Sequence, residues 1–212
     1  MPLTKTARTV LVAAIPAAAI ACAVAVLNIP PDEKLGTMVR FVMFHGASTW
    51  VNMGTFTLAG LCGLAFVFGA ERLGRWGEAF RWFSLPLWTV NTVLGILSMK
   101  LIWGGILWNE PRLMMTFGLL AASVVILAIQ LIFEHPRVPA VLDAVLAAAL
   151  WFLVLVLPNL FHPDSPVFAS ENTAYIYGFL GMVVSIAIVA LAIVTLIARR
   201  RHGEHPHGHA LP

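Results

Sequence analysis

This chain of 212 residues contains two histidines and one tryptophan-rich segment whose side chains could bind a cofactor. His45 lies in FVMFHGASTW and His162 in NLFHPDSPVF, and the segment WGGILWNEPRLM (103–114) lies between them in the sequence. Imidazole is the usual protein ligand of haem iron, and indole rings suit the face of a flat porphyrin. If the three segments share one end of a helical bundle, they predict a haem site at a membrane surface.

The composition predicts the kind of fold that must position these residues. Of the residues, 60% are hydrophobic and 11% are charged, a balance typical of a polytopic membrane protein. The apolar runs are continuous rather than alternating, which argues against a β-barrel. We therefore expect an all-α integral membrane protein with a single transmembrane domain (1–198) and a basic, histidine-rich tail (199–212). Its six transmembrane helices are predicted at about 9–28, 41–69, 83–102, 114–133, 138–158 and 174–198.

The basic residues predict the orientation of the six helices. Four of them fall on one side, namely Lys34, Arg40, Lys100 and Arg112. Nine fall on the other side: Lys5, Arg8, Arg137, Arg199–Arg201, and Arg72, Arg75 and Arg81 in a predicted loop after the second helix. The positive-inside rule then places both termini in the cytoplasm. The expected location is the plasma (inner) membrane, with His45, the tryptophan-rich loop between the third and fourth helices, and His162 on the extracytoplasmic side.

The first helix also resembles a signal sequence. Lys5 and Arg8 precede an Ala/Val run that contains Ala21-Cys22, as in a cleavable or lipoprotein signal. The run continues without a break through Val26, so we expect an uncleaved helix.

His45 lies inside the second helix, where a polar side chain is costly and often functional. Ser48, Thr49 and Asn52 follow at spacings of three, four and seven, which predicts a polar stripe that points into the bundle. A neutral histidine that bonds a neighbouring helix would give the same pattern.

His162 lies in a loop between Pro163 and Pro166. A single loop histidine is most often just solvated. However, only two histidines are expected on the extracytoplasmic side, and six-coordinate haem iron takes two axial ligands.

The loop between the third and fourth helices combines aromatic, glycine and charged residues. Trp103 and Trp108 stand at interfacial depth, and Gly104 permits a turn or a close approach of backbone to a flat ligand. Pro111 stands where a new helix could begin, with Glu110 at its start.

Three cations flank this loop and could pair with haem propionates: Arg40, Lys100 and Arg112. Without the histidines, the loop and its cations would fit an aromatic belt with snorkelling side chains equally well.

Taken in order, these segments resemble the haem-handling family of cytochrome c assembly proteins, and most closely its six-helix CcmC branch. His45 to Trp50 loosely matches the family motif His-Val-Pro-Ala-Ala-Trp-Met. Trp103-Gly104 and the run from Glu110 to Leu113 match the two ends of its loop motif, Trp-Gly-Thr-Tyr-Trp-Val-Trp-Asp-Ala-Arg-Leu. The resemblance covers about residues 40–172. Leu107, Asn109 and Glu110 depart from the motif, which puts the handover step in question.

The resemblance implies a binding protein rather than an enzyme. His45 and His162 would be the axial ligands of a non-covalent, b-type haem, with Trp103 and Trp108 against the macrocycle and Lys100 or Arg112 at the propionates. The partners it implies are a membrane-tethered haem chaperone and the subunits of an ATP-driven transporter complex, with no nucleic acid.

Other interpretations remain open. The chain could be a transporter or permease-like component without stoichiometric haem, in which the polar stripe forms part of a pathway. A b-type electron-transfer subunit fits less well, because His135 is the one histidine outside the tail that is expected on the cytoplasmic side. The alternating tail histidines (His205, His207 and His209) could bind a metal weakly, although such a tail is more often solvated. Cys22 and Cys62 lie far apart in apolar runs and suggest no zinc site.

Overall fold

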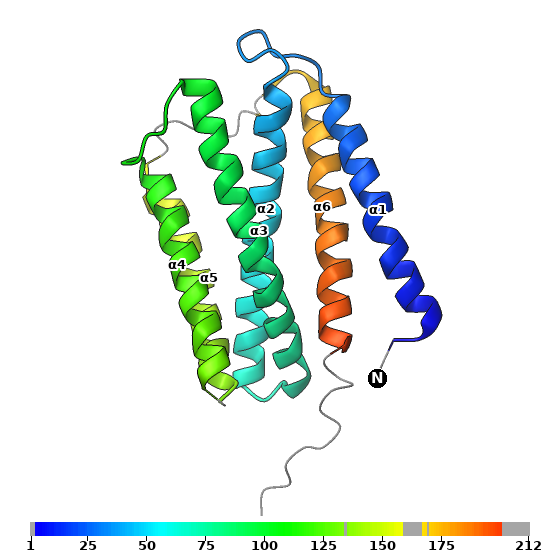
Figure 1. Cartoon of the computed structure of the whole chain (residues 1–212), viewed down its shortest axis with the longest axis vertical. Helices are drawn as coiled ribbons and strands as arrows, with labels where there is room; N and C mark the ends of the chain where they lie inside the picture. The colour runs from blue at the N-terminus through cyan, green and yellow to red at the C-terminus, as the bar shows by residue number, and fades with distance from the viewer. Residues whose placement is uncertain (1–2, 134, 159–166, 169, 201–212) are drawn as a thin grey trace, which may run out of the picture.

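Six long α-helices make up nearly all of the described chain (Figure 1). The computed structural model describes residues 3–133, 135–158, 167–168 and 170–200. The helices are α1 (Lys5–Leu27), α2 (Val39–Val67), α3 (Glu71–Trp103), α4 (Pro111–Ile132), α5 (Arg137–Val156) and α6 (Thr173–Arg200).

The lengths and the surface of the helices fit a lipid environment. All six are long and apolar enough to cross a membrane, as the sequence predicted. Large apolar side chains cover the outside of the bundle, for example Phe152 and Leu155 on α5, which are 65% and 82% exposed. A soluble protein rarely exposes such extended apolar surface, whereas hydrocarbon tails solvate it at no cost.

The helices run alternately up and down, so the loops gather at two ends. Residues 104–110 and the first residues of α2 and α6 lie at one end, which we call the His45 end (Figure 1). Residues 68–70, the first residues of α5 and the last residues of α6 lie at the other, the Arg137 end. The predicted grouping of His45 with the tryptophan-rich loop therefore holds.

α2 is the central helix of the bundle and contacts α3, α5, α6 and α1. Glycines allow a close contact with α5. A Cβ atom on Gly60 would stand 2.8 Å from the Cβ of Ala147, and one on Gly63 would stand 2.6 Å from the carbonyl oxygen of Ala140. Small residues that bring two backbones together are a common means of helix association in membranes.

The third helix begins earlier than the sequence predicted, at Glu71 rather than near residue 83. Arg72, Arg75 and Arg81 therefore lie on α3 and not in a loop, which corrects that expectation. The charges had interrupted the apolar run, but Phe80, Ser84 and Trp88 are buried at spacings of four and form one packed face. At 1.5 Å per residue, the 33 residues of α3 span about 50 Å, more than the roughly 30 Å of a hydrocarbon core.

Candidate functional site

His45 is half-buried in the second turn of α2, and its ring packs against α3. A Cβ atom on Gly95 would stand 3.2 Å from Cε1 and 3.5 Å from Nε2 of His45. The first distance is tighter than ordinary van der Waals contact and the second is an ordinary contact, so a larger residue at position 95 would push the imidazole aside. The Cε1–Nε2 edge of the ring thus occupies the room that Gly95 leaves on α3.

The loop at the end of α3 turns at Gly104, as the sequence predicted. Gly104 ends α3 in the left-handed conformation, with φ of 72°, which glycine adopts without strain. Trp103 and Trp108 on either side of the turn are 42% and 58% exposed. Trp108 stacks on Phe117 of α4, with ring centroids 6.4 Å apart, so one of its faces is already occupied by protein.

The charged residues of this loop have different surroundings. Glu110 is buried, and its Oε2 accepts a hydrogen bond of 2.6 Å from the backbone N–H of Leu113. It is therefore the N-cap of α4, and Pro111 is the first helical residue, as the sequence predicted. Lys100 is exposed and Arg112 is half-buried, which leaves both cations at this surface.

Arg40 is engaged elsewhere. Its Nε donates a hydrogen bond of 2.8 Å to the carbonyl oxygen of Ile29, so the side chain holds the α1–α2 connection against α2. Lys100 and Arg112 are therefore better candidates than Arg40 for pairing with haem propionates.

An aromatic cluster that the sequence analysis did not single out lies next to the His45 turn. The ring centroid of Trp50 is 5.6 Å from those of both Phe168 and Phe179, which are 5.9 Å from each other. A Cβ on Gly46 would stand 3.4 Å from Phe179. Because Phe168 belongs to the α5–α6 connection, the cluster brings the end of that connection onto α2, one turn from His45. His162 itself lies outside the described residues.

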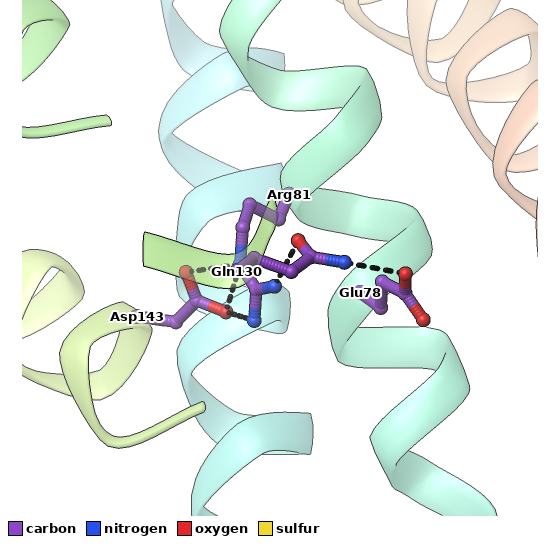
Figure 2. A network of polar contacts seen from close by, with 4 residues as sticks. All are labelled: Glu78, Arg81, Gln130 and Asp143. Atoms are coloured by element: carbon purple, nitrogen blue, oxygen red, sulfur yellow. Dashed lines mark hydrogen bonds and ion pairs between the residues drawn. The ribbon is translucent and has the colours of Figure 1, made fainter. Parts of the chain in front are cut away.

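A buried polar network lies toward the Arg137 end, where α3, α4 and α5 meet (Figure 2). Arg81 is 7% exposed and Asp143 is 3% exposed. The guanidinium donates through Nε to both carboxylate oxygens of Asp143 (2.9 Å each) and through Nη2 to Oδ2 (2.5 Å). Its Nη1 donates to Oε1 of Gln130 (2.5 Å), and Nε2 of Gln130 donates to Glu78 (2.5 Å).

The sequence contained a signal for this network. Asp143 is the only charged residue in the apolar run 138–158, and ionisable residues inside a span are usually paired. Its partner Arg81 was missed because the sequence analysis placed that arginine in a loop.

The predicted polar stripe of α2 points into the bundle: Ser48 and Asn52 are at most 3% exposed and Thr49 is half-buried. Thr55, one turn further along α2, is also buried. Oγ of Ser84 on α3 donates to Oγ1 of Thr55 (2.8 Å), and the Thr55 hydroxyl donates to Asn52, where the backbone carbonyl is 2.8 Å away and Oδ1 is 3.0 Å away. The stripe, Thr55 and their partners on α3 form what we call the α2–α3 polar seam.

A second pair of hydrogen bonds extends the seam toward the His45 end. Nδ2 of Asn91 on α3 donates to Oγ1 of Thr49 (2.9 Å), and Oγ1 of Thr49 donates to the backbone carbonyl of His45 (2.9 Å). Asn91 is buried and lies one turn before Gly95 on α3. The seam therefore leads to the turn of α3 against which the imidazole packs.

No cluster of metal-ligating side chains is present among the described residues. Cys22 and Cys62 are both free. A metal at His45 would therefore need a ligand from outside the described ranges or a cofactor that carries the metal.

The fold defines a protein with six helices that are long and apolar enough to span a membrane, and a half-buried histidine lies near one end of the bundle. No protein-family model matches the chain, and comparison with curated protein sequences also gives no match. The resemblance to the cytochrome c assembly family thus depends on the quoted segments alone.

Proposed function

We propose that this protein binds haem at the extracytoplasmic face of a membrane and passes it to a haem chaperone or apocytochrome. The observation that carries the proposal is a half-buried imidazole inside a membrane-spanning helix, at the end of the bundle where the tryptophan-rich loop also lies. Haem, when bound, supplies an iron that takes imidazole ligands, and His45 would help to hold it.

His162 would supply the second axial ligand. His162 lies six positions before Phe168, a length of chain that reaches at most about 20 Å. Since Phe168 packs on Trp50, the chain length is compatible with His162 and His45 serving one cofactor.

The loop residues fit supporting roles. The exposed indoles of Trp103 and Trp108 could cover the porphyrin, and Lys100 and Arg112 could pair with its propionates. Gly104 shapes the turn, whereas Glu110 would act indirectly, by fixing the start of α4.

The orientation of the protein is part of the proposal. Arg81 is a buried ion-pair partner, so it does not count as a free cytoplasmic charge. The remaining basic residues at the Arg137 end still outnumber those at the His45 end. The positive-inside rule therefore continues to favour cytoplasmic termini and a histidine site on the opposite face of the plasma membrane.

The decisive experiment measures the haem-to-protein ratio and the optical spectrum of detergent-purified protein. We expect near-stoichiometric haem with a low-spin bis-histidine spectrum in the wild type, lost or converted to high spin in His45→Ala and in His162→Ala. His135→Ala is the matched control, because His135 is exposed at the Arg137 end and should leave the spectrum unchanged. A wild type that stays haem-free on reconstitution would refute the proposal.

A Gly95→Leu variant tests whether the position of the imidazole matters. Its side chain would push the His45 ring away from α3, so the haem affinity should fall even though both histidines remain. Unchanged affinity would mean that the contact with Gly95 does not position His45 for haem.

A second candidate function is a transporter or permease-like component without stoichiometric haem. The α2–α3 polar seam favours it, because polar side chains in membrane spans often line a pathway. It predicts a haem-free protein in which His162→Ala has no effect on substrate transport.

A further inference from the structure

The arginines at the Arg137 end differ in whether a carboxylate neutralises them. Arg81 pairs with Asp143, and Arg137 lies 3.7 Å from Glu71. Arg75 is half-buried, yet no hydrogen bond or ion pair joins it to any residue that the structure describes. It is therefore a cation that is partly removed from solvent and has no counter-ion within the described chain.

The surroundings of Arg75 leave its charge open to a partner from outside the chain. Its Nε is buried without an acceptor in the described part of the chain, whereas its two terminal nitrogens remain accessible. The acidic residues at helical spacing from it on α3 have other partners, because Glu78 accepts from Gln130 and Glu71 lies against Arg137. A partly buried charge without a partner is costly, and the paired N–H groups of a guanidinium match the oxygens of a phosphate.

Two further arginines lie close to Arg75. Arg72 is exposed and lies three residues before Arg75 and four before Trp76, so it shares a helix surface with both. The guanidinium of Arg199, in the last turn of α6, lies over the ring of Trp76, 5.7 Å from its centroid. This cation–π contact holds Arg199 beside the first turns of α3, at the end of the bundle where α6 finishes (Figure 1). We call Arg72, Arg75 and Arg199 the α3–α6 basic corner.

An apolar strip continues from this corner toward the middle of the bundle. Trp76 and Phe83 are seven residues apart on α3, and both are half-buried and pack with Ile197 against a cluster that includes Val194 and Ala198 of α6. From Trp76 to Phe83 the strip covers about 10 Å along the helix. A membrane phospholipid has the same two parts, a phosphate and apolar acyl chains, whereas inorganic phosphate has only the first.

The depth of the corner in a bilayer also fits a lipid headgroup. α3 spans about 50 Å, which is roughly 20 Å more than the hydrocarbon core. Arg75 lies about 6 Å from the start of α3, so it stands in the headgroup layer when the excess length is shared between the two ends. The exposed ion pair of Glu71 and Arg137 also places the start of α3 outside the hydrocarbon.

We propose that the α3–α6 basic corner binds the phosphate of an anionic phospholipid, with an acyl chain along Trp76 and Phe83. The terminal nitrogens of Arg75 donate to the phosphate oxygens. Arg72 and Arg199 add positive charge, which favours a lipid with a net negative headgroup over a zwitterionic one. The site lies at the opposite end of the bundle from His45, and it depends neither on haem nor on which end faces the cytoplasm.

The test measures the equilibrium binding of radiolabelled lipid to the immobilised full-length protein in detergent. Phosphatidylglycerol and phosphatidylcholine with the same acyl chains are titrated separately, and inorganic phosphate is added as a competitor against chloride of equal ionic strength. We expect the wild type to bind phosphatidylglycerol about tenfold more tightly than phosphatidylcholine. Inorganic phosphate should not displace the lipid, because it cannot occupy the apolar strip.

Arg75→Gln removes the charge and the paired donors, so the affinity for phosphatidylglycerol should fall about tenfold. Arg8→Gln is the matched control, since it makes the same change in charge at an exposed position of the same end. Arg8 belongs to α1, which makes no contact with α3 in the described part of the chain, so this variant should change the affinity less than about twofold. Arg75→Lys keeps the charge but loses the fork of donors, and its affinity should lie between those of the wild type and Arg75→Gln.

Equal affinity of the wild type for the two lipids would overturn the proposal. Equal losses in Arg75→Gln and Arg8→Gln would also overturn it, because a diffuse surface charge gives that result. Displacement of the lipid by inorganic phosphate would show that the corner binds free phosphate and would refute the lipid assignment. If Arg75→Gln does not fold, the exposed Arg72→Gln decides, and an unchanged affinity in that variant would refute the site.

Discussion

Removing one partner of the Arg81–Asp143 pair should destabilise the bundle far more than removing both. The carboxylate accepts bonds from two guanidinium nitrogens, and the two side chains are 8% and 3% exposed. Asp143→Ala would leave Arg81 charged in an apolar setting, and the loss of one partner of a buried pair costs about 3–5 kcal/mol. Because Gln130 still accepts from Nη1, we expect a value near the lower end, about 3 kcal/mol.

The double variant Arg81→Met, Asp143→Leu removes both charges and keeps much of the packing volume. Replacing a buried ion pair by apolar residues is often neutral or stabilising, so the double variant should recover most of the loss. The assay is reversible unfolding in mixed detergent micelles at increasing SDS. The exposed pair of Glu71 and Arg137 is the control: its atoms are 3.7 Å apart on side chains 69% and 64% exposed, so Arg137→Ala should cost less than about 1 kcal/mol.

A cost below about 1 kcal/mol for Asp143→Ala would show that the pair is hydrated, and the reasoning from burial would then be wrong. A double variant as unstable as the single one would contradict the argument from uncompensated charge. In that case the network would matter for its geometry and not for its charge balance.

Three further predictions concern packing, capping and pH. Gly63→Ala should destabilise the bundle by about 1–3 kcal/mol, because the new Cβ would stand 2.6 Å from the carbonyl oxygen of Ala140. Gly54→Ala is the control, because its Cβ would have no other atom within 4 Å and should not destabilise the bundle. Unfolding in SDS compares the two variants. Glu110→Ala should cost about 1 kcal/mol through loss of the α4 cap and should raise amide exchange in the first turn of α4. Hydrogen bonds from the backbone N–H groups of residues 35 and 34 lower the pKa of Asp32 below its usual value. The contribution of these hydrogen bonds to stability is complete above the pKa that Asp32 has in the unfolded chain. It is lost as the pH falls through the lower pKa that Asp32 has in the folded protein. Amide protection in residues 32–36 should therefore decrease at acid pH in the wild type but not in Asp32→Asn.

The sequence predicted the number of membrane helices and the end at which His45 and the tryptophan-rich loop meet. Both depend on apolar run length and on the alternation of up and down helices, which are local properties. The start of α3 was not predictable in the same way, because Arg81 looks like a loop cation until Asp143 is known to face it. The partner of a buried charge is a tertiary property, and no spacing within one helix contains it.

The candidate site shows the same division between local and tertiary information. The stripe of Ser48, Thr49 and Asn52 could be assigned to the inside of the bundle from its spacing, and in the structure Ser48 and Asn52 are buried and Thr49 is half-buried. The pairing of His45 with Gly95 could not, because a glycine in α3 has no feature in the sequence that connects it with a histidine 50 positions earlier.

The two halves of α2 make different kinds of contact with the neighbouring helices. Toward the Arg137 end, Gly60 and Gly63 bring its backbone against α5, and the Arg81–Asp143 pair joins α5 to α3 in the same region. These contacts fix α2 and α3 relative to each other, and a binding residue must be held by such a rigid support to keep its geometry. Toward the His45 end, α2 is joined to α3 by a side-chain hydrogen bond, and the imidazole packs on Gly95 of α3. Gly63 lies roughly 27 Å along α2 from His45, so variants at Gly63 should disturb the support of the His45 site without touching the imidazole.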